Sequence, residues 1–141
     1  MGRIIIHLHG KTKEKSLRLI IEKYLKRLES DSVKIIEHKD NLSGTQYLLS
    51  LEKDVKDSPL ILFDEEGSDY NSIDFSNLVK SWRLNVKDIH LAIGPASGFP
   101  ENNFKKISLS KMTFPHELAA LILIEQIYRS MQILKGTKYH K

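Results

Sequence analysis

The chain has 141 residues, of which 40% are hydrophobic and 28% charged, and its net charge is +4. This length suits one domain with a sizeable core, and the mild positive charge is compatible with a polyanionic partner without indicating one. The absence of cysteine excludes disulfides, thiolate metal sites and a cysteine nucleophile. The N-terminal segment is too polar for a signal peptide, and the longest apolar run, 118–124, is too short for a membrane span. We therefore expect one soluble, cytoplasmic domain over residues 1–141, with neither a membrane nor DNA as a partner.

Apolar patterning predicts an alternation of strands and helices along the chain. Short runs rich in β-branched residues predict strands over 3–8, 33–37, 59–64, 88–93 and 106–109. Helical spacing of apolar residues predicts helices over 13–29, 44–56, 73–84 and 115–134, with a further short helix over 100–106. A turn is predicted at 66–68, after a strand that ends in the carboxylate of Asp64.

This alternation predicts an α/β fold in which a parallel sheet is covered by helices on both faces. Ligands of such sheets bind beyond the carboxyl ends of the strands. Those ends carry three polar or glycine-rich loops, 64–67, 94–98 and 110–113. The loops are expected to converge on one edge of the sheet and to form the site there.

The two later loops each allow two interpretations. The loop from Gly94 to Gly98 lets a backbone approach a flat ligand closely, but glycines also mark ordinary turns. Pro115 suits a helix start, where free N–H groups favour a carboxylate or phosphate. Thr113 is placed to act as a ligand contact or simply as the cap of that helix.

The last helix is apolar almost all round from 118 to 124, which is typical of a central helix or of one that also meets another subunit. Glu125 and Arg129 have the spacing of an ion pair on a helix surface, and Arg129 is alternatively placed to hold RNA or a neighbouring tail.

The remaining charged and titratable residues give weaker signals. The basic positions 11, 13, 15, 18 and 26 fit a solvated helix face better than a phosphate contact. His7, His9, His38 and His90 lie in or beside predicted strands without convincing metal-ligand spacing. We interpret them as structural, and no metal site is predicted.

Several segments together resemble one known family. They are 108–116 (SLSKMTFPH), 123–129 (LIEQIYR), the terminal 139–141 (YHK), 91–94 (LAIG) with Gly98, and 62–64 (LFD) with Gly67. The chain resembles the RlmH family, which are SPOUT-superfamily methyltransferases that act on a pseudouridine of large-subunit ribosomal RNA. The similarity covers essentially the whole chain.

The resemblance implies a C-terminal trefoil knot, a homodimer built around the last helix, and S-adenosylmethionine as cofactor. It implies that mainly backbone groups of the knot hold the cofactor, at Phe63, Gly67, Gly94, Pro95, Gly98, Leu109, Ser110, Lys111, Met112, Thr113, Phe114 and Pro115. The family usually has a glycine at the position of Pro95. Proline offers no N–H there, so only a carbonyl contact to the cofactor would survive.

The implied reaction is methyl transfer to N3 of a pseudouridine in 23S ribosomal RNA within the ribosome. Our candidates for the base that removes the N3 proton are His140 and, second, His116. Tyr139 and Lys141 would orient the base or the RNA, and Arg129 would hold a phosphate or the tail. Two alternatives remain: a SPOUT methyltransferase with another RNA nucleoside as target, and a non-catalytic RNA- or ribosome-binding dimer, which Pro95 keeps open.

Overall fold

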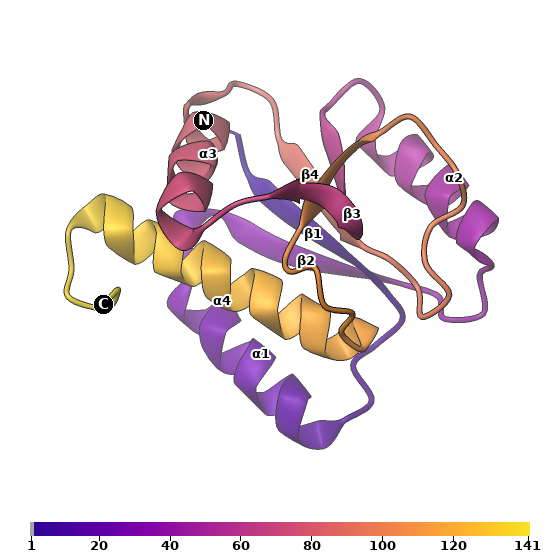
Figure 1. The fold of residues 1–141 in the computed structure, drawn as a ribbon, viewed down its shortest axis with the longest axis horizontal. Helices are drawn as coiled ribbons and strands as arrows, with labels where there is room; N and C mark the ends of the chain where they lie inside the picture. Colours follow the sequence, from indigo (N-terminus) through magenta and orange to yellow (C-terminus); the bar gives the residue numbers. More distant parts are fainter. Residues whose placement is uncertain (1) are drawn as a thin grey trace.

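The computed structural model describes residues 2–141 and contains one five-stranded sheet with helices on both faces (Figure 1). The strands are β1 (Ile4–His9), β2 (Val33–His38), β3 (Leu60–Asp69), β4 (Ile89–Ile93) and β5 (Lys105–Ser108). The helices are α1 (Lys15–Arg27), the 3-10 turn η1 (Glu29–Asp31), α2 (Gly44–Val55), α3 (Ser72–Leu84) and α4 (His116–Lys135).

The sheet has the strand order β2-β1-β4-β3-β5, and every neighbouring pair is parallel. The central strands β1 and β4 are buried on both faces, which is why they consist of nearly continuous apolar runs. The predicted α/β class and the parallel sheet are confirmed.

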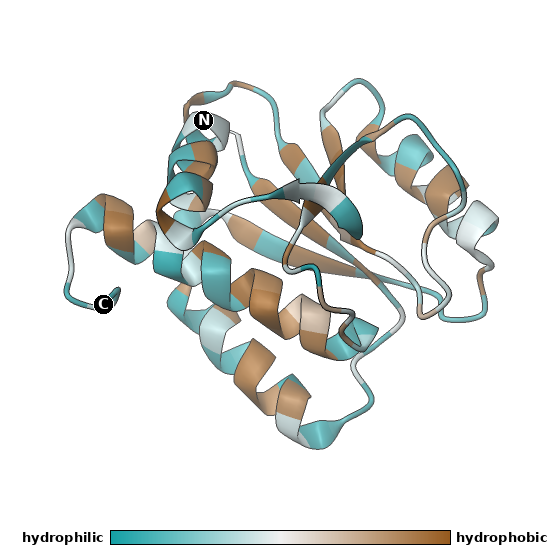
Figure 2. Ribbon diagram, viewed as in Figure 1, coloured by the Kyte–Doolittle hydropathy of each residue, from teal (hydrophilic) through white to brown (hydrophobic). Residues whose placement is uncertain are grey.

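The larger core lies on the face covered by α1, α3 and α4. Ile6 and Leu91 of the sheet meet Ile21 of α1, Val79 of α3 and Ile124 of α4 there. Helix α4 contacts both α1 and α3, and Figure 2 shows hydrophobic residues along its middle. The prediction of a central helix is thus confirmed.

The opposite face carries α2 and a smaller core. Ser43 and Gln46 form a capping box that starts α2, and Leu51 packs toward Leu62 of β3. This face also buries polar side chains, among them His7. Burial, together with the neighbouring His38 and His90, lowers the pKa of His7 from 6.5 to about 3, so its imidazole is neutral at pH 7.

Two local predictions are wrong. Residues 100–104 form no helix, because the Asn102 side chain donates to the Pro100 carbonyl and accepts from the Phe104 N–H, at 2.8 and 2.9 Å. The third strand does not end at Asp64: β3 continues to Asp69, with a register shift in which Phe63 and Ser68 both pair with Ile107.

Gly67 makes this register shift possible. A Cβ at Gly67 would lie 2.6 Å from the backbone N of Ile107, closer than two such atoms approach. A side chain there would push β3 away from β5. The polar residues 64–67 therefore bulge out of the strand instead of ending it.

Helix α4 begins at His116, with Pro115 at the N-cap position, and ends at Gly136, whose φ of +73° suits glycine. The predicted trefoil knot concerns how the segment between β5 and α4 threads through the preceding loops, and it stays a prediction. Among residues 2–141, no helix combines the length and hydrophobicity needed to cross a bilayer.

Candidate functional site

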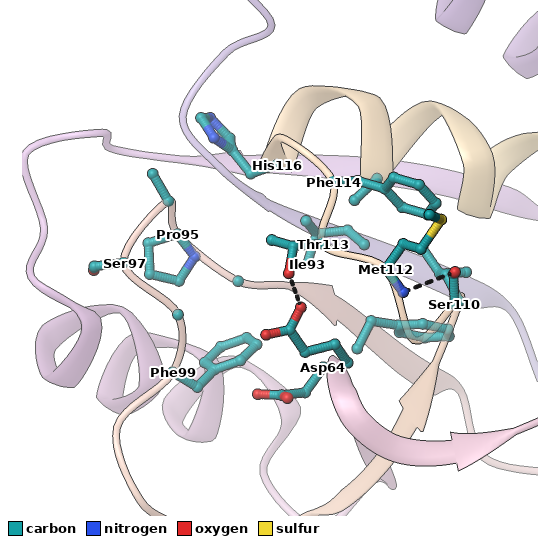
Figure 3. A pocket seen from close by; sticks show the side chains of 17 residues that line it. Asp64, Ile93, Pro95, Ser97, Phe99, Ser110, Met112, Thr113, Phe114 and His116 are labelled. Carbon is teal, nitrogen blue, oxygen red and sulfur yellow. Dashed lines mark hydrogen bonds between the residues drawn. The ribbon is translucent and has the colours of Figure 1, made fainter.

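A cleft of about 240 Å³ opens at the carboxyl ends of β3, β4 and β5, beside the first turn of α4 (Figure 3). Its walls come from residues 63–65, at the bulge within β3, and from the segments that follow β4 and β5. The lining residues are Phe63, Asp64, Glu65, Ile93, Gly94, Pro95, Ala96, Ser97, Gly98, Phe99, Leu109, Ser110, Met112, Thr113, Phe114, His116 and Ala119. The predicted convergence of the three loops at one sheet edge is confirmed.

The loop after β4 is a tight turn. The Gly98 N–H donates to the Pro95 carbonyl at 2.8 Å, and Gly98 has a φ of +84°, which favours glycine. A Cβ at Gly94 would lie 3.1 Å from the Phe99 ring, so this position leaves little room for a side chain. Pro95 takes part in the turn as an acceptor, through its carbonyl. The turn therefore forms although proline has no N–H.

Helix α2 packs against this loop through Tyr47. The Tyr47 hydroxyl donates to the Ile93 carbonyl at 2.8 Å, and its ring stacks on Phe99 with centroids 5.8 Å apart. Tyr47 is fully buried, and burial raises its hydroxyl pKa, so it remains a donor at every ordinary pH. The sequence predicted a helix over 44–56 but not this bond from Tyr47 to the cleft.

The loop between β5 and α4 is organised by its own hydroxyl groups. Ser108 donates to the Ser110 carbonyl at 2.7 Å, and the Met112 N–H donates to the Ser110 hydroxyl at 3.0 Å. The Thr113 hydroxyl donates to Glu65 across the cleft, as the dashed line in Figure 3 marks. Thr113 therefore does not cap α4, and that interpretation is wrong.

Asp64 and Glu65 line the cleft; they belong to the predicted loop 64–67, although no role was predicted for either side chain. Asp64 accepts the Glu66 N–H at 2.9 Å, which closes the first turn of the bulge in β3. Their signal was present, because the strand predicted over 59–64 ended in a carboxylate at the ligand edge of the sheet. Two carboxylates beside an otherwise mixed apolar and hydroxyl lining favour a ligand that carries positive charge.

The cleft gathers most of the residues predicted for the cofactor. Phe63, Gly94, Pro95, Gly98, Leu109, Ser110, Met112, Thr113 and Phe114 line it, together with the candidate base His116. Three others do not: Gly67 spaces β3 from β5, Lys111 is exposed and lies 3.8 Å from Asp69, and Pro115 precedes α4.

The terminal residues fold back and form a second cluster along the second half of α4. Arg129 pairs with Glu125 at 2.9 Å, which confirms the predicted ion pair, and also contacts Nδ1 of His140 at 3.1 Å. The Tyr139 hydroxyl donates to Glu125 at 2.7 Å and accepts from Tyr24 of α1 at 3.2 Å. Burial and these two bonds raise the pKa of Tyr139.

The two clusters do not meet within one chain. Helix α4 has 20 residues, which at 1.5 Å per residue span about 30 Å. His116 stands at the start of this span, and Arg129, which contacts His140, lies 13 residues further along it, at about 20 Å.

Comparison with known proteins places this geometry in a family. The model of a family described as predicted SPOUT methyltransferases matches residues 2–140. The chain belongs to this SPOUT methyltransferase family. The fold and the resemblance predicted from sequence agree with it.

Relatives of this SPOUT methyltransferase match over nearly their whole length. A protein of Flavobacterium psychrophilum is 38% identical, covering 93% of this chain and 94% of its own. Proteins of Koribacter versatilis and Kosmotoga olearia are 37% and 33% identical, and each comparison covers at least 92% of both chains. All three are named ribosomal RNA large subunit methyltransferase H.

A solved structure has the same fold. Nep1 of Archaeoglobus fulgidus, crystallised with S-adenosylhomocysteine, superposes with a TM-score of 0.53 at 13% identity, over 93% of this chain and 99% of its own. At this identity the likeness concerns the fold of the SPOUT methyltransferase and not its ligand or substrate.

Proposed function

We propose that residues 1–141 act as one S-adenosylmethionine-dependent methyltransferase domain, in the cytoplasm, on large-subunit ribosomal RNA. The names of the relatives support the substrate class, and the resemblance stated above supports N3 of a 23S pseudouridine as the target atom. The observation that carries the proposal is the cleft, in which three strand-end segments of a SPOUT chain meet at the start of α4.

The lining of the cleft fits the proposed cofactor chemically. Ile93, Leu109 and Phe114 offer apolar surface for a flat base, while the turn from Pro95 to Gly98 offers backbone polar groups. Glu65 would face the positively charged sulfonium. A carboxylate would be favoured near the first turn of α4, whose N-terminus has no side-chain cap.

When bound, the cofactor would supply an activated methyl group on sulfur. In the proposed reaction this methyl group would go to N3 of the pseudouridine, the electron pair of the broken bond would stay on sulfur, and a base of the protein would accept the N3 proton. The chain's contribution is to hold N3 in line and to accept that proton, which are effects worth several kcal/mol and roughly 10²–10⁴-fold, respectively.

We assign the base to His140 of a second copy, with His116 as the runner-up. His140 is held by Arg129, which lies about 20 Å along α4 from His116 and the cleft of its own chain, so it approaches a cleft only from a partner. Two α4 helices packed antiparallel around a two-fold axis would place the tail of each chain beside the cleft of the other.

The outward stripe of α4 is suited to this homodimer. Leu118 and Ile122, near the cleft, are half-buried, and Glu125 and Arg129 continue the same stripe toward the tail. The network of Arg129, Glu125 and Tyr139 holds the tail in one place, so that it would be presented to a partner already ordered.

The direct test is methylation of ribosomes isolated from cells that lack this enzyme. Labelled methyl groups are expected in large-subunit RNA at one pseudouridine, and little incorporation is expected in free transfer RNA. Incorporation into transfer RNA instead would establish a SPOUT methyltransferase with another target.

Pro95 favours a second candidate, a dimer that binds RNA or ribosomes without catalysis. Because Pro95 has no N–H to offer, cofactor affinity is the property that separates the two. Titration with S-adenosylhomocysteine in a calorimeter is expected to give saturable heat. No heat at millimolar ligand would favour the binding protein.

A further inference from the structure

Three histidines lie together on the α2 face of the sheet, outside the lining of the cleft. His7 on β1 is fully buried, and its two ring nitrogens contact His38 on β2 and His90 on β4, each at 2.8 Å. Residues on a central parallel strand are ordinarily aliphatic. A row of imidazoles across three adjacent strands is therefore a feature that packing alone does not require.

A carboxylate completes this group. Asp54 on α2 brings Oδ2 to 3.8 Å from Nε2 of His38, and one ligand atom each of His7, His38 and Asp54 lie within 4.8 Å of one another. The three residues come from β1, β2 and α2, so the fold brings together positions that are distant in sequence. The Asp54 side chain is 42% exposed, which gives an ion a path from solvent.

The outer nitrogens of the two imidazoles also have partners. His7 Nε2 faces Nδ1 of His90 at 2.8 Å, and His38 Nδ1 faces the Ser50 hydroxyl at 3.2 Å. If both outer nitrogens carry the proton, Nδ1 of His7 and Nε2 of His38 keep free lone pairs that point at each other. Histidines that bind metals are oriented by the same kind of outer hydrogen bond.

We propose that His7, His38 and Asp54 form a binding site for a divalent transition-metal ion of the zinc class. Two neutral imidazoles and a carboxylate are ligands that zinc accepts, with water in the fourth position. Tetrahedral bonds of about 2.1 Å place ligand atoms about 3.4 Å apart. The nitrogens of His7 and His38, now 2.8 Å apart, would thus separate by about 0.6 Å, which small rotations of the two rings provide.

Such an ion would join α2 to β1 and β2. Tyr47 on the same helix supports the loop after β4, so the site would stiffen a wall of the cleft without taking part in it. The proposal does not depend on the proposed methylation, because its readout is ion binding.

The test uses the full chain without a polyhistidine tag, stripped with a chelator and titrated with Zn²⁺ in a calorimeter. One equivalent per chain is expected, and Co²⁺ at the same site is expected to give the visible absorption of a four-coordinate ion. His38→Ala and Asp54→Asn are expected to weaken Zn²⁺ binding by about 100-fold or more, and His90→Asn and Ser50→Ala by about 10-fold.

His140→Ala is the matched control, because it removes a histidine outside the group and should leave zinc binding unchanged. Asp54 is exposed enough that Asp54→Asn should fold normally, and circular dichroism checks each variant. If the wild-type chain takes up no zinc, or if His38→Ala and Asp54→Asn bind it as well as wild type, the site does not exist. The histidines would then be only a hydrogen-bonded chain.

Discussion

The two ends of α4 carry two polar clusters that are built in different ways. At the His116 end, backbone turns from three loops surround an open cleft, and few of its side chains are tied to one another. At the other end, Glu125, Arg129, Tyr139 and His140 are locked by side-chain bonds between 2.7 and 3.1 Å. A backbone cleft preformed in one chain and a rigid tail far from it suit a site shared between two copies.

The largest expected effect is on the chemistry, at the tail. His140→Ala should slow single-turnover methylation of ribosomes by about 10²–10⁴-fold, because the N3 proton loses its acceptor. Calorimetry should find unchanged S-adenosylhomocysteine affinity, since the tail is not part of the cleft. If instead His116→Ala abolished turnover while His140→Ala did not, the base would belong to the cleft's own chain.

Mixing two inactive variants tests whether the cleft of one chain works with the tail of another. Gly94→Val fills the space beside Phe99, where even a Cβ would lie at 3.1 Å, and should block the cleft. Mixed with His140→Ala, it should restore about a quarter of wild-type activity, because half of the dimers are mixed and one of their two sites is intact. The mixture is assayed after the subunits have exchanged; no recovery would place cleft and base in the same chain.

The next effect concerns stability near the cleft. Gly67→Ala should lower the free energy of unfolding by about 3 kcal/mol, because the added Cβ meets the backbone of Ile107 at 2.6 Å. Gly98→Ala is the matched control: its Cβ meets nothing within 4 Å, so it should lose only about 1 kcal/mol from its positive φ. Urea unfolding measures both, and equal losses would contradict the close approach at Gly67.

One tyrosine at each polar cluster allows the cleft and the tail to be compared directly. Tyr47→Phe and Tyr139→Phe each remove one donated hydrogen bond, to Ile93 and Glu125, and each should cost about 1 kcal/mol of stability. Only Tyr47→Phe should weaken S-adenosylhomocysteine binding, because Tyr47 supports the cleft. Only Tyr139→Phe should slow methylation at saturating cofactor. Calorimetry measures the binding and single-turnover assays measure the rate on both variants. Weaker binding by Tyr139→Phe, or slower methylation at saturating cofactor by Tyr47→Phe, would contradict these separate roles.

Local sequence patterns were sufficient for the parts of the fold that are themselves local. The run Ile4–Ile6 and the alternation of strands and helices predicted the parallel sheet, and a rule about strand ends then placed the three loops together. The failure at the end of the third strand involves contacts distant in sequence. Residues 66–68 have turn composition, yet Ser68 pairs with Ile107 of β5.

The candidate site divides in the same way. Gly94 and Thr113 were found because each lies in a loop that follows a strand, whereas Phe63, inside β3, was indicated only by the family resemblance. The group of His7, His38 and Asp54 was missed because its members are brought together only by the order of strands in the sheet and by the packing of α2 on it. The short helix expected over 100–106 failed for a local reason, since the side chain of Asn102 competes for the backbone groups that a helix would use.

The smallest effect concerns the charge that joins the start of α4 to α1. Burial raises the pKa of Glu117, but the N–H groups of Glu14 and Lys13, each at 3.1 Å, lower it more, so it lies below its usual 4.5. Because the folded pKa is lower than the unfolded one, the charge stabilises the protein above about pH 4.5, and this stabilisation is lost as pH falls through the folded pKa.

Glu117→Gln should therefore cost about 0.5 kcal/mol at pH 7 and nothing at about pH 3. Glu22→Gln, at an exposed position of α1, is the control. Urea unfolding at both pH values gives the comparison. A loss that stayed the same at low pH would mean that the shape of the carboxylate, and not its charge, aligns the cleft end of α4 with α1.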